Sequence, residues 1–366
     1  MASLTEIFTS IEISNSEIRG MVVKSDTKGK DKMLAFTRQA PTGFSRGIIV
    51  DMDLATESLK RVKLDLEAQA GITISSATIG ISGTYLEAFD SRGVAAIAGK
   101  EIVTTDMQRA SECAVDINIP SGRRLVYGEI KEFVIDGYEG IKNPLGMPGT
   151  RLDVIPYLVH GAAFPLDCIE RVCTRVNISI DRFVPISLAL ARAVASSAEM
   201  QAGVLVLDLE AETTSMAIYH SGGPVYMETL LLGINDILGK KGSSDGMTNL
   251  LGMIQDKLNR AGVAELIQTV VVADKDNMTS PISRGLKLLL KKPVRNGKVK
   301  NPFEMRGKSE GNSLSALIAI YMLSNAKSLA TSLENQPIEN KKSSNKKSKK
   351  EMPPIETMDL MLPVLR

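Results

Sequence analysis

Residues 139–147 read Glu139-Gly140-Ile141-Lys142-Asn143-Pro144-Leu145-Gly146-Met147. Glycine and proline recur through this stretch and its flanks, from Asp136 to Gly149, which indicates turn chemistry rather than regular structure. Three short strands and one helix are predicted around it, at 94–97, 126–135 and 152–159 and, for the helix, 105–115. The sequence Thr104-Thr105-Asp106 offers that helix an N-cap. We therefore predict a small α+β insertion at 84–161.

Outward from the insertion, the start of the chain shows paired strands. Runs rich in Ile and Val at 7–13 and 18–24 flank Ser14-Asn15-Ser16, the pattern of a hairpin that opens a sheet. A third apolar run at 47–50 leads into a helical pattern that ends near Ala70, and 72–81 alternates like a strand. Beyond the insertion, 164–176 and 185–197 predict two helices.

A second strand, turn and strand unit begins near residue 203. Its predicted strands are 203–209, 215–219 and 225–232. They repeat the strand-turn-strand order of the first hairpin, which suggests a duplication. The pattern further predicts helices at 247–261, 264–269 and 313–329 and a buried strand at 270–273.

Composition excludes several classes of protein. A chain of 366 residues, 43% of them hydrophobic, can bury more than one core, and a net charge of +2 lacks the basic excess of a nucleic-acid binder. Cys113, Cys168 and Cys173 have no histidine cluster beside them, so we interpret them as thiols of a reducing cytoplasm rather than metal ligands. His160 and His220 lack a nucleophile partner, and we predict no catalytic residue. No window approaches the roughly 18 apolar residues of a membrane span.

The motifs of the insertion resemble the FtsA family, actin-like proteins that tether the division tubulin FtsZ to the bacterial inner membrane. The resemblance rests on Ser91-Arg92-Gly93-Val94-Ala95, Val134-Ile135-Asp136-Gly137, the stretch 139–147 and Arg151-Leu152. The segment 47–52 is also similar to the family's segment ahead of its first helix. The resemblance covers about residues 7–238, and 247–330 more loosely.

The resemblance implies an α/β, actin-like (Hsp70/actin/sugar-kinase) two-lobed fold with an inserted SHS2-like subdomain and a truncated second lobe. We expect the first lobe at 1–83 and 162–200, the insertion at 84–161 and the second lobe at 201–330, shortened around 239–246. A Lys-rich linker at 331–351 and a short C-terminal motif at 352–366 follow.

The family's phosphate loops are degenerate in this chain. The first, Asp-Ile-Gly-Thr-Ser, corresponds to Glu12-Ile13-Ser14-Asn15-Ser16, and the second, Asp-Ile-Gly-Gly-Gly-Thr-Thr-Asp, corresponds to 208–215. Small residues let backbone N–H groups approach an anion, whereas Glu210 and Glu212 would place negative charge where a polyphosphate should lie. The adenosine-binding Thr-Gly-Gly-Gly turn corresponds to Ala273-Asp274-Lys275-Asp276 and has lost its glycines too.

We therefore interpret the nucleotide site as eroded into structural turns, with weak ATP-Mg binding as the alternative. Such weak binding would use the remnants of the two loops, which are Ser14, Asn15, Ser16, Asp208, Thr213 and Thr214. The second lobe is also shortened, since about a dozen residues lead from Asp236 to the next helix where the family has a sizeable subdomain. That subdomain supplies much of the family's groove for the FtsZ tail.

The C-terminal tail allows two interpretations. Five apolar residues share one helical face and would insert into lipid: Ile355, Met358, Met361, Leu362 and Leu365. Six lysines upstream would favour an anionic membrane surface. Against a helix stand Pro353, Pro354 and Pro363, and an extended peptide docked in a partner's groove is the rival interpretation.

The sequence thus predicts a cell-division adaptor that resembles FtsA and has no efficient ATP hydrolysis. It would tether FtsZ or other division proteins to the cytoplasmic face of the cell membrane and self-associate into filaments. Two alternatives remain open: an actin-superfamily protein that still binds ATP weakly, and a pilus-type actin-like assembly protein. The latter would lack the match at Gly140–Met147.

Overall fold

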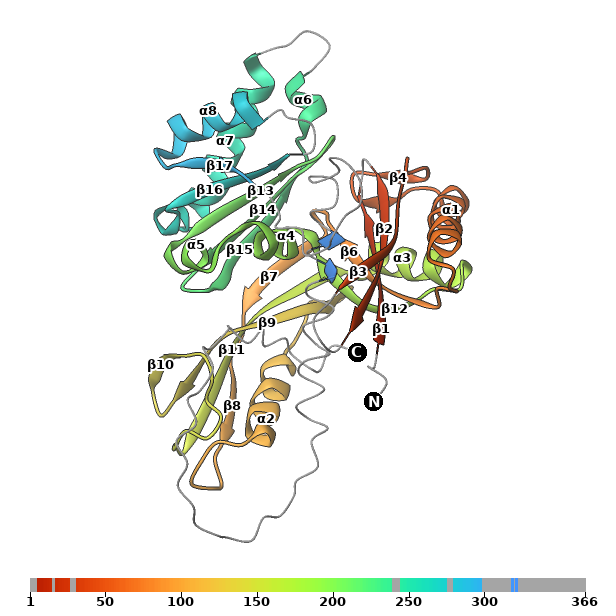
Figure 1. The fold of residues 1–366 in the computed structure, drawn as a ribbon. Coiled ribbons are helices and arrows are strands. Elements are labelled where there is room, and N and C mark those ends of the chain that lie inside the picture. The colour runs from red at the N-terminus through yellow and green to blue at the C-terminus, as the bar shows by residue number, and fades with distance from the viewer. Residues whose placement is uncertain are drawn as a thin grey trace.

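The computed structural model describes residues 5–14, 17–26, 31–238, 244–274, 279–297, 317–318 and 320–321. Three five-stranded sheets dominate the described part of the chain. A separate hairpin of two short strands is also present. Figure 1 shows the three sheets as separate bodies that meet near the centre of the molecule.

The first sheet has the strand order β12-β6-β1-β2-β3. Its strands are β1 (Thr5–Ile13), β2 (Ile18–Asp26), β3 (Lys32–Gln39), β6 (Ser76–Ile81) and β12 (Ser179–Pro185). β1 and β2 form the expected hairpin, and β6 pairs with β1 and β12 in parallel. Strands β3 and β12 were not predicted. The apolar run at 47–50 gives only a short pairing of β4 (Phe44–Ser45) with β5 (Ile48–Ile49).

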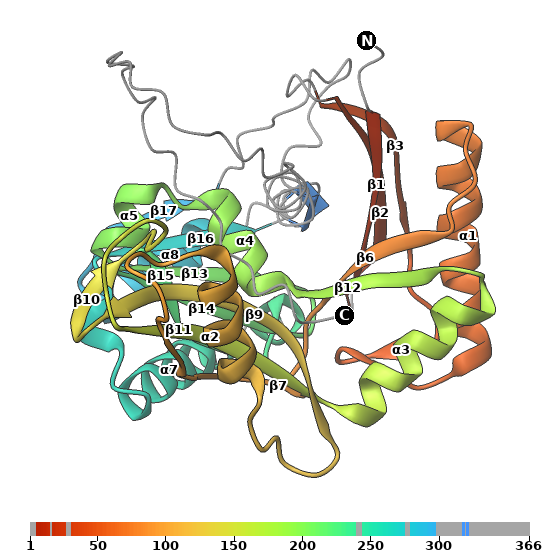
Figure 2. The same ribbon diagram turned by 90° about the horizontal axis from the view of Figure 1, so that it is seen from below.

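Helices α1 (Met52–Ala70) and α3 (Ala163–Arg175) cover the outer face of this sheet, as Figure 2 shows. The Asp51 carboxylate caps α1 by accepting hydrogen bonds from the first-turn N–H groups, and Gly71 ends the helix at φ 67°. The buried face repeats at helical spacing through Ala55, Leu59, Val62 and Leu66. Leu66 lies over Gly20 of β2, where a side chain would collide with it.

The insertion forms the second sheet, with the order β10-β9-β11-β7 and β8 paired to β11. Its strands are β7 (Leu86–Asp90), β8 (Gly93–Ala96), β9 (Arg123–Ile135), β10 (Tyr138–Ile141) and β11 (Arg151–Ala162). Helix α2 (Thr104–Val115) packs on this sheet around a small core that includes Ala110, Phe133 and Leu152.

Two details of the insertion differ from the sequence prediction. Helix α2 begins at Thr104, so Val103 is the N-cap residue, and the Asp106 carboxylate caps the helix from within by accepting from Val103 N at 3.0 Å. Strands β7 and β10 were not predicted, because β7 lies in a short stretch of mixed polarity and β10 lies inside the glycine-rich loop.

The second lobe carries the third sheet, with the order β15-β14-β13-β16-β17. Its strands are β13 (Val204–Leu209), β14 (Thr214–His220), β15 (Gly223–Leu230), β16 (Thr269–Asp274) and β17 (Val294–Asn296). Its helices are α6 (Ile234–Leu238), α7 (Ser244–Arg260) and α8 (Thr279–Leu290). The predicted helix at 264–269 is wrong: only Ala264–Leu266 is helical, as the 3-10 turn η1, and β16 begins at Thr269.

The segment between the lobes also departs from one expected helix. The helix expected at 185–197 is instead two helices: α4 (Ile186–Val194) and, after a break at Ala195, α5 (Ser197–Ala202). The break is explained by Ser196, which starts α5 with a capping box: its hydroxyl accepts from Glu199 N, and the Glu199 carboxylate accepts from Ser196 N.

One buried carboxylate joins the insertion to both lobes. Glu129 on β9 accepts hydrogen bonds from Arg192 of α4 at 2.6 Å, from the Tyr219 hydroxyl of β14 at 3.1 Å and from Tyr127 at 3.2 Å. The insertion is therefore fixed against the lobes by buried polar bonds, in addition to the contacts of β7 and β9 with β15.

Only four residues of the predicted helix at 313–329 are described. Leu317, Ile318, Ile320 and Tyr321 are helical and buried. Tyr321 packs edge-on against Phe8 of β1, with ring centroids 5.6 Å apart. These four residues thus join the core of the first lobe, although the expected division of the chain placed them in the second.

Candidate functional site

The turn after β1 is closed by a serine side chain. Ser14 is buried, and its hydroxyl lies 3.1 Å from the Glu17 carbonyl and 3.3 Å from Glu17 N. Its own N–H donates to the Glu17 carbonyl. In a glycine-rich phosphate loop, backbone N–H groups remain available to bind an anion. Here the hydroxyl and the N–H of Ser14 form hydrogen bonds within the turn.

A buried ion pair lies directly behind this turn. Glu12 and Arg19 are cross-strand partners in β1 and β2, and both side chains are 0% exposed. Arg19 Nη2 donates to Glu12 Oε1 at 2.7 Å, and Arg19 Nε lies 3.5 Å from Glu17 Oε2. Removing one partner of such a pair is costly, because it weakens the compensation of the other charge in a low-dielectric environment.

The matching loop of the second lobe, 210–213, connects β13 to β14. Glu210 N donates to the Thr213 carbonyl at 3.0 Å, and the Thr214 hydroxyl donates to the Leu232 carbonyl at 2.7 Å. The carbonyl groups of Glu210 and Ala211 accept from the first N–H groups of α6. This loop is therefore tied into its own lobe as a structural turn.

Charges from both lobes converge on Arg19. Its burial lowers the pKa of the guanidinium, but Glu12, Glu210, Asp208 and Glu17 together raise that pKa above its ordinary value. Asp208 and Glu210 are buried and belong to the second lobe, whereas Arg19 belongs to the first. The cation thus lies where the two strand-turn-strand units face each other.

Two further hydrogen bonds cross between the lobes at this place. The Ser82 and Ser215 hydroxyls are 2.9 Å apart, and Arg46 N donates to Glu212 Oε2 at 3.4 Å. Glu212 therefore contacts the first lobe, and Glu210 faces Arg19. The two glutamates that were expected to repel a polyphosphate instead help to bind one lobe to the other.

Of the six predicted nucleotide remnants, Ser14 lies in the turn after β1, Asp208 lies on β13, and Thr213 and Thr214 lie where the second-lobe loop enters β14. Asn15 and Ser16 lie outside the described residues, as do Lys275 and Asp276 of the third signature and the apolar residues of the tail, Ile355, Met358, Met361, Leu362 and Leu365. Sequence reasoning missed Arg19. A hairpin with residues 14–17 as its loop pairs Ile13 with Ile18, and that register alone places Arg19 opposite Glu12.

The remaining candidate residues have structural surroundings. Cys173 is fully buried in the first core, Cys168 packs against that core, and Cys113 is exposed. Among the described residues, no group of three His, Cys, Asp or Glu side chains could hold a metal ion. No helix within the described ranges is long and apolar enough to cross a membrane.

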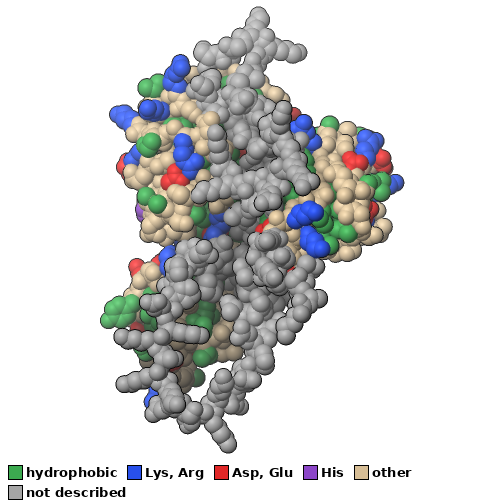
Figure 3. Space-filling view, viewed as in Figure 1, with side chains coloured by type: hydrophobic (Ala, Val, Ile, Leu, Met, Phe, Trp, Pro, Cys, Tyr) green, Lys and Arg blue, Asp and Glu red, His purple; other side chains and the backbone are tan. Residues whose placement is uncertain are grey.

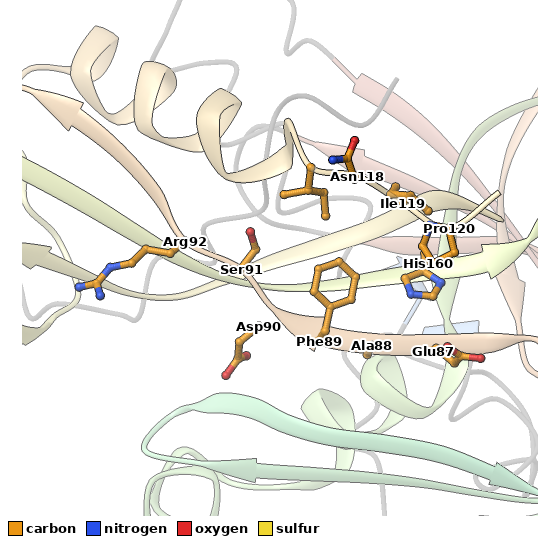
Figure 4. Close-up of a pocket in the computed structure, with 11 residues that line it drawn as sticks. Glu87, Ala88, Phe89, Asp90, Ser91, Arg92, Asn118, Ile119, Pro120 and His160 are labelled. Atoms are coloured by element: carbon orange, nitrogen blue, oxygen red, sulfur yellow. The ribbon is translucent and has the colours of Figure 1, made fainter.

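A second candidate site is a cavity of about 580 Å³ beside β7. It is lined by residues 87–92, residues 117–120 and His160. Figure 4 shows the Phe89 ring on the side of β7 that faces Asn118–Pro120. Arg123 Nε donates to His160 Nδ1 at 2.6 Å and fixes the imidazole in the neutral form that accepts at Nδ1. The walls of this cavity are apolar at Phe89 and Ile119 and charged at Glu87, Asp90 and Arg92.

Comparison with known proteins first defines the class. The solved structure of the PilM-PilN type IV pilus biogenesis complex superimposes with a TM-score of 0.60 at 14% identity, over 86% of this chain and 98% of the other. At that identity the likeness shows the fold alone. A family model described as the SHS2 domain inserted in FTSA matches residues 83–160. The chain is an actin-like, two-lobed protein with an SHS2 insertion, as its sequence predicted.

The relatives then identify the particular protein that it resembles. The cell division protein FtsA of Pseudomonas aeruginosa is 27% identical over 217 residues, which is 59% of this chain and 52% of that protein. FtsA of Borreliella burgdorferi is 28% identical over 233 residues, 63% of this chain and 56% of that protein. The predicted resemblance to FtsA is confirmed, and the chain spans about half the length of the curated relatives it matches.

Proposed function

We propose that this protein is a cell-division adaptor that resembles FtsA and tethers FtsZ or other division proteins to the cytoplasmic face of the cell membrane. The SHS2 insertion at 83–160 carries this proposal, because its sequence matches the model of the domain inserted in FtsA. The relatives named above are themselves cell division proteins. These relatives favour this proposal over the pilus-type alternative, which rests on a likeness of fold alone.

We further propose that the adaptor works without efficient ATP binding or hydrolysis. The Glu12–Arg19 pair supports this, since ATP phosphates would have to displace it and would then face Glu12, Asp208 and Glu210. Each carboxylate so exposed would repel the polyphosphate. The hydrogen bonds between the lobes at Ser82 and Glu212 would also have to break for the cleft to open.

Isothermal titration with ATP-Mg, followed by a phosphate-release assay, tests nucleotide independence. We expect no binding in the micromolar range and no phosphate release from protein whose thermal unfolding shows it to be folded. Micromolar binding accompanied by phosphate release would overturn the proposal and leave the weak ATPase as the better description.

The cavity beside β7 is the place where we propose that a partner segment docks. An extended peptide could lie in this cavity, bury an apolar side chain against Phe89 and Ile119, and meet charges of both signs. The usual FtsZ groove is reduced by the shortened second lobe, so a separate docking place is useful for an adaptor of this kind.

A pull-down from the native cell tests the partners. We expect FtsZ or another division protein in the eluate of the unaltered chain, and its loss from Phe89→Ala with Ile119→Ala. The matched control is Phe164→Ala, an exposed aromatic of α3 outside the cavity, which should recover the same partner. Recovery of no division protein by the unaltered chain contradicts the adaptor role, and equal recovery by all variants contradicts the docking place alone.

A further inference from the structure

Helix α8 presents an unusual surface on the outer side of the second lobe. Arg284, Lys287 and Leu288 are exposed on one side of α8, at i, i+3 and i+4, and the exposed Lys291 directly follows the last residue of the helix. We call these four residues the basic face. Ile282 and Leu286, on the opposite side, are fully buried in the core of the lobe. Figure 3 shows Lys and Arg side chains gathered at the upper left, where Figure 1 places α8.

The charge of this segment is one-sided. Residues 279–297 contain five basic residues and no acidic one: Arg284, Lys287, Lys291, Lys292 and Arg295. Arg295 pairs with Glu199 at 2.7 Å, and Lys292 donates to Gln268. Within the part of the chain that the structure describes, Arg284, Lys287 and Lys291 form no ion pair. The neighbouring helix α7 carries Lys257 and Arg260 in its last turn, and Lys257 is paired with Glu228 at 3.2 Å.

Helix stability explains only part of this pattern. Cations near a helix C-terminus interact favourably with the helix dipole, which accounts for Lys287 and Lys291. It does not account for Leu288, which is 75% exposed between them. A single exposed leucine is ordinary on a protein surface. A leucine next to cations that form no ion pair with the described residues matches the composition of helices that lie at a lipid interface.

We propose that the basic face of α8 contacts an anionic lipid surface and gives the protein a second membrane contact besides its tail. This inference rests on the peripheral membrane association proposed above, but not on the tail. A convex helix on the outside of a lobe suits a flat surface. None of the four residues of the basic face lines the cavities beside β7, near Gln39 or between α1 and α3.

The test measures how the full-length chain binds vesicles of neutral lipid with and without an anionic lipid. Four forms are compared: the unaltered chain, Arg284→Gln with Lys287→Gln, the tail variant Met358→Glu with Leu362→Glu, and the combination. Each lysine or arginine near an anionic surface contributes about fivefold to affinity, so the α8 variant should bind anionic vesicles about 25-fold more weakly at low salt. The combination should bind more weakly than the tail variant.

A matched control is available on α1. Lys60→Gln with Arg61→Gln also removes two exposed cations, but from a helix whose surface carries Asp53, Glu57 and Glu67 among them. Its binding should change by less than about twofold. Leu288→Gln should weaken binding in a way that persists at high salt, because the apolar contribution is not screened.

Several results would overturn the inference. If the α8 variant and the α1 control bind vesicles equally, with the unaltered tail or with the tail variant, α8 does not contact lipid. If the α8 variant keeps vesicle binding but loses self-association in sedimentation, the basic face contacts a second copy of the chain instead. A protein that binds vesicles through α8 but recovers no division protein in the pull-down refutes the adaptor role while leaving this inference standing.

Discussion

At the scale of single residues, the buried cation Arg19 explains more of the closed inter-lobe cluster than the missing loop glycines do. Sequence alone identified the lost glycines and the intruding Glu210 and Glu212, and it interpreted both loops as structural turns. It did not predict that Arg19 would gather carboxylates from both lobes. The electrostatic influence of Asp208 and Glu210 on Arg19 depends on how the lobes face each other, which no local pattern encodes.

The Glu12–Arg19 pair predicts a large and coupled loss of stability. Arg19→Met leaves Glu12 buried without its partner, and we expect the free energy of unfolding to fall by about 3 to 5 kcal/mol. Arg19→Met with Glu12→Gln should lose less than Arg19→Met alone, since one uncompensated charge is gone. Guanidinium unfolding measures both.

An exposed pair of the same kind serves as the control. Arg61 and Glu57 lie one helical turn apart on α1, with side chains 62% and 51% exposed. Arg61→Met should change stability by less than about 0.5 kcal/mol. If the buried and exposed variants lose the same amount, the buried pair stabilises the protein no more than an exposed pair does.

His160 predicts a pH dependence of stability. Burial lowers the pKa of its imidazole, and Arg123 lowers it further against the opposing effect of Glu87. Below the ordinary histidine pKa of 6.5, the unfolded chain takes up a proton that the folded protein refuses, so stability falls as the pH drops. His160→Gln, which can still accept from Arg123, should show a shallower loss between about pH 7 and 5 in thermal unfolding. Identical slopes for the two proteins would assign the effect to other groups.

At the scale of elements, long periodic segments were predictable and short ones were not. Helices α1, α3 and α7 and the strands of both hairpins follow from their hydrophobic periods. Strand β12 was missed because Ser179–Pro185 mixes charges with only a brief apolar end. Helix α8 was missed because Pro281 and Gly285 interrupt its pattern, although Gly285 is where Leu251 of α7 approaches most closely.

The insertion predicts where copies of the chain touch. Its outer end exposes Val103, Leu145 and Met147, which lie together because Ile102 exchanges backbone hydrogen bonds with Gly146 and Met147. Leu145→Ser with Met147→Ser should weaken self-association in sedimentation, because it removes apolar area that a contact would bury. Phe164→Ser on α3, also exposed, should leave it unchanged. Undiminished association of the insertion variant would point to another surface.

At the scale of the whole molecule, the two-lobed actin-like fold with its SHS2 insertion was predictable, since specific motifs carried it. The domain boundaries stay predictions. The chain's return near residue 320 to the first sheet could not be predicted, because an apolar helix does not reveal which of two cores it will join.

The tail gives a prediction that can be separated from the folded lobes. A fusion of residues 341–366 to a soluble reporter should bind vesicles that contain anionic lipid, through six lysines and one apolar face. Salt should weaken the electrostatic part, since the Debye length falls from about 10 Å at 0.1 M to about 3 Å at 1 M.

Substitution within the tail distinguishes its two interpretations. Met358→Glu with Leu362→Glu removes the lipid face and spares the lysines, so binding should drop even at low salt. If it does not, the lysines act alone. If the unaltered tail never binds vesicles, the extended docking peptide takes its place.

The buried pair between β1 and β2 also has an evolutionary consequence. A glycine restored at position 14 would reopen the turn but leave Arg19 held by Glu12 behind it. A glycine restored at position 210 would withdraw a carboxylate from Arg19 and weaken the closed lobes before any ligand could compensate. Each single reversion therefore lowers stability without restoring a function, so selection opposes every first step back. Under the proposed function, closure of the two lobes would depend on Arg19 and the carboxylates around it rather than on the energy charge of the cell.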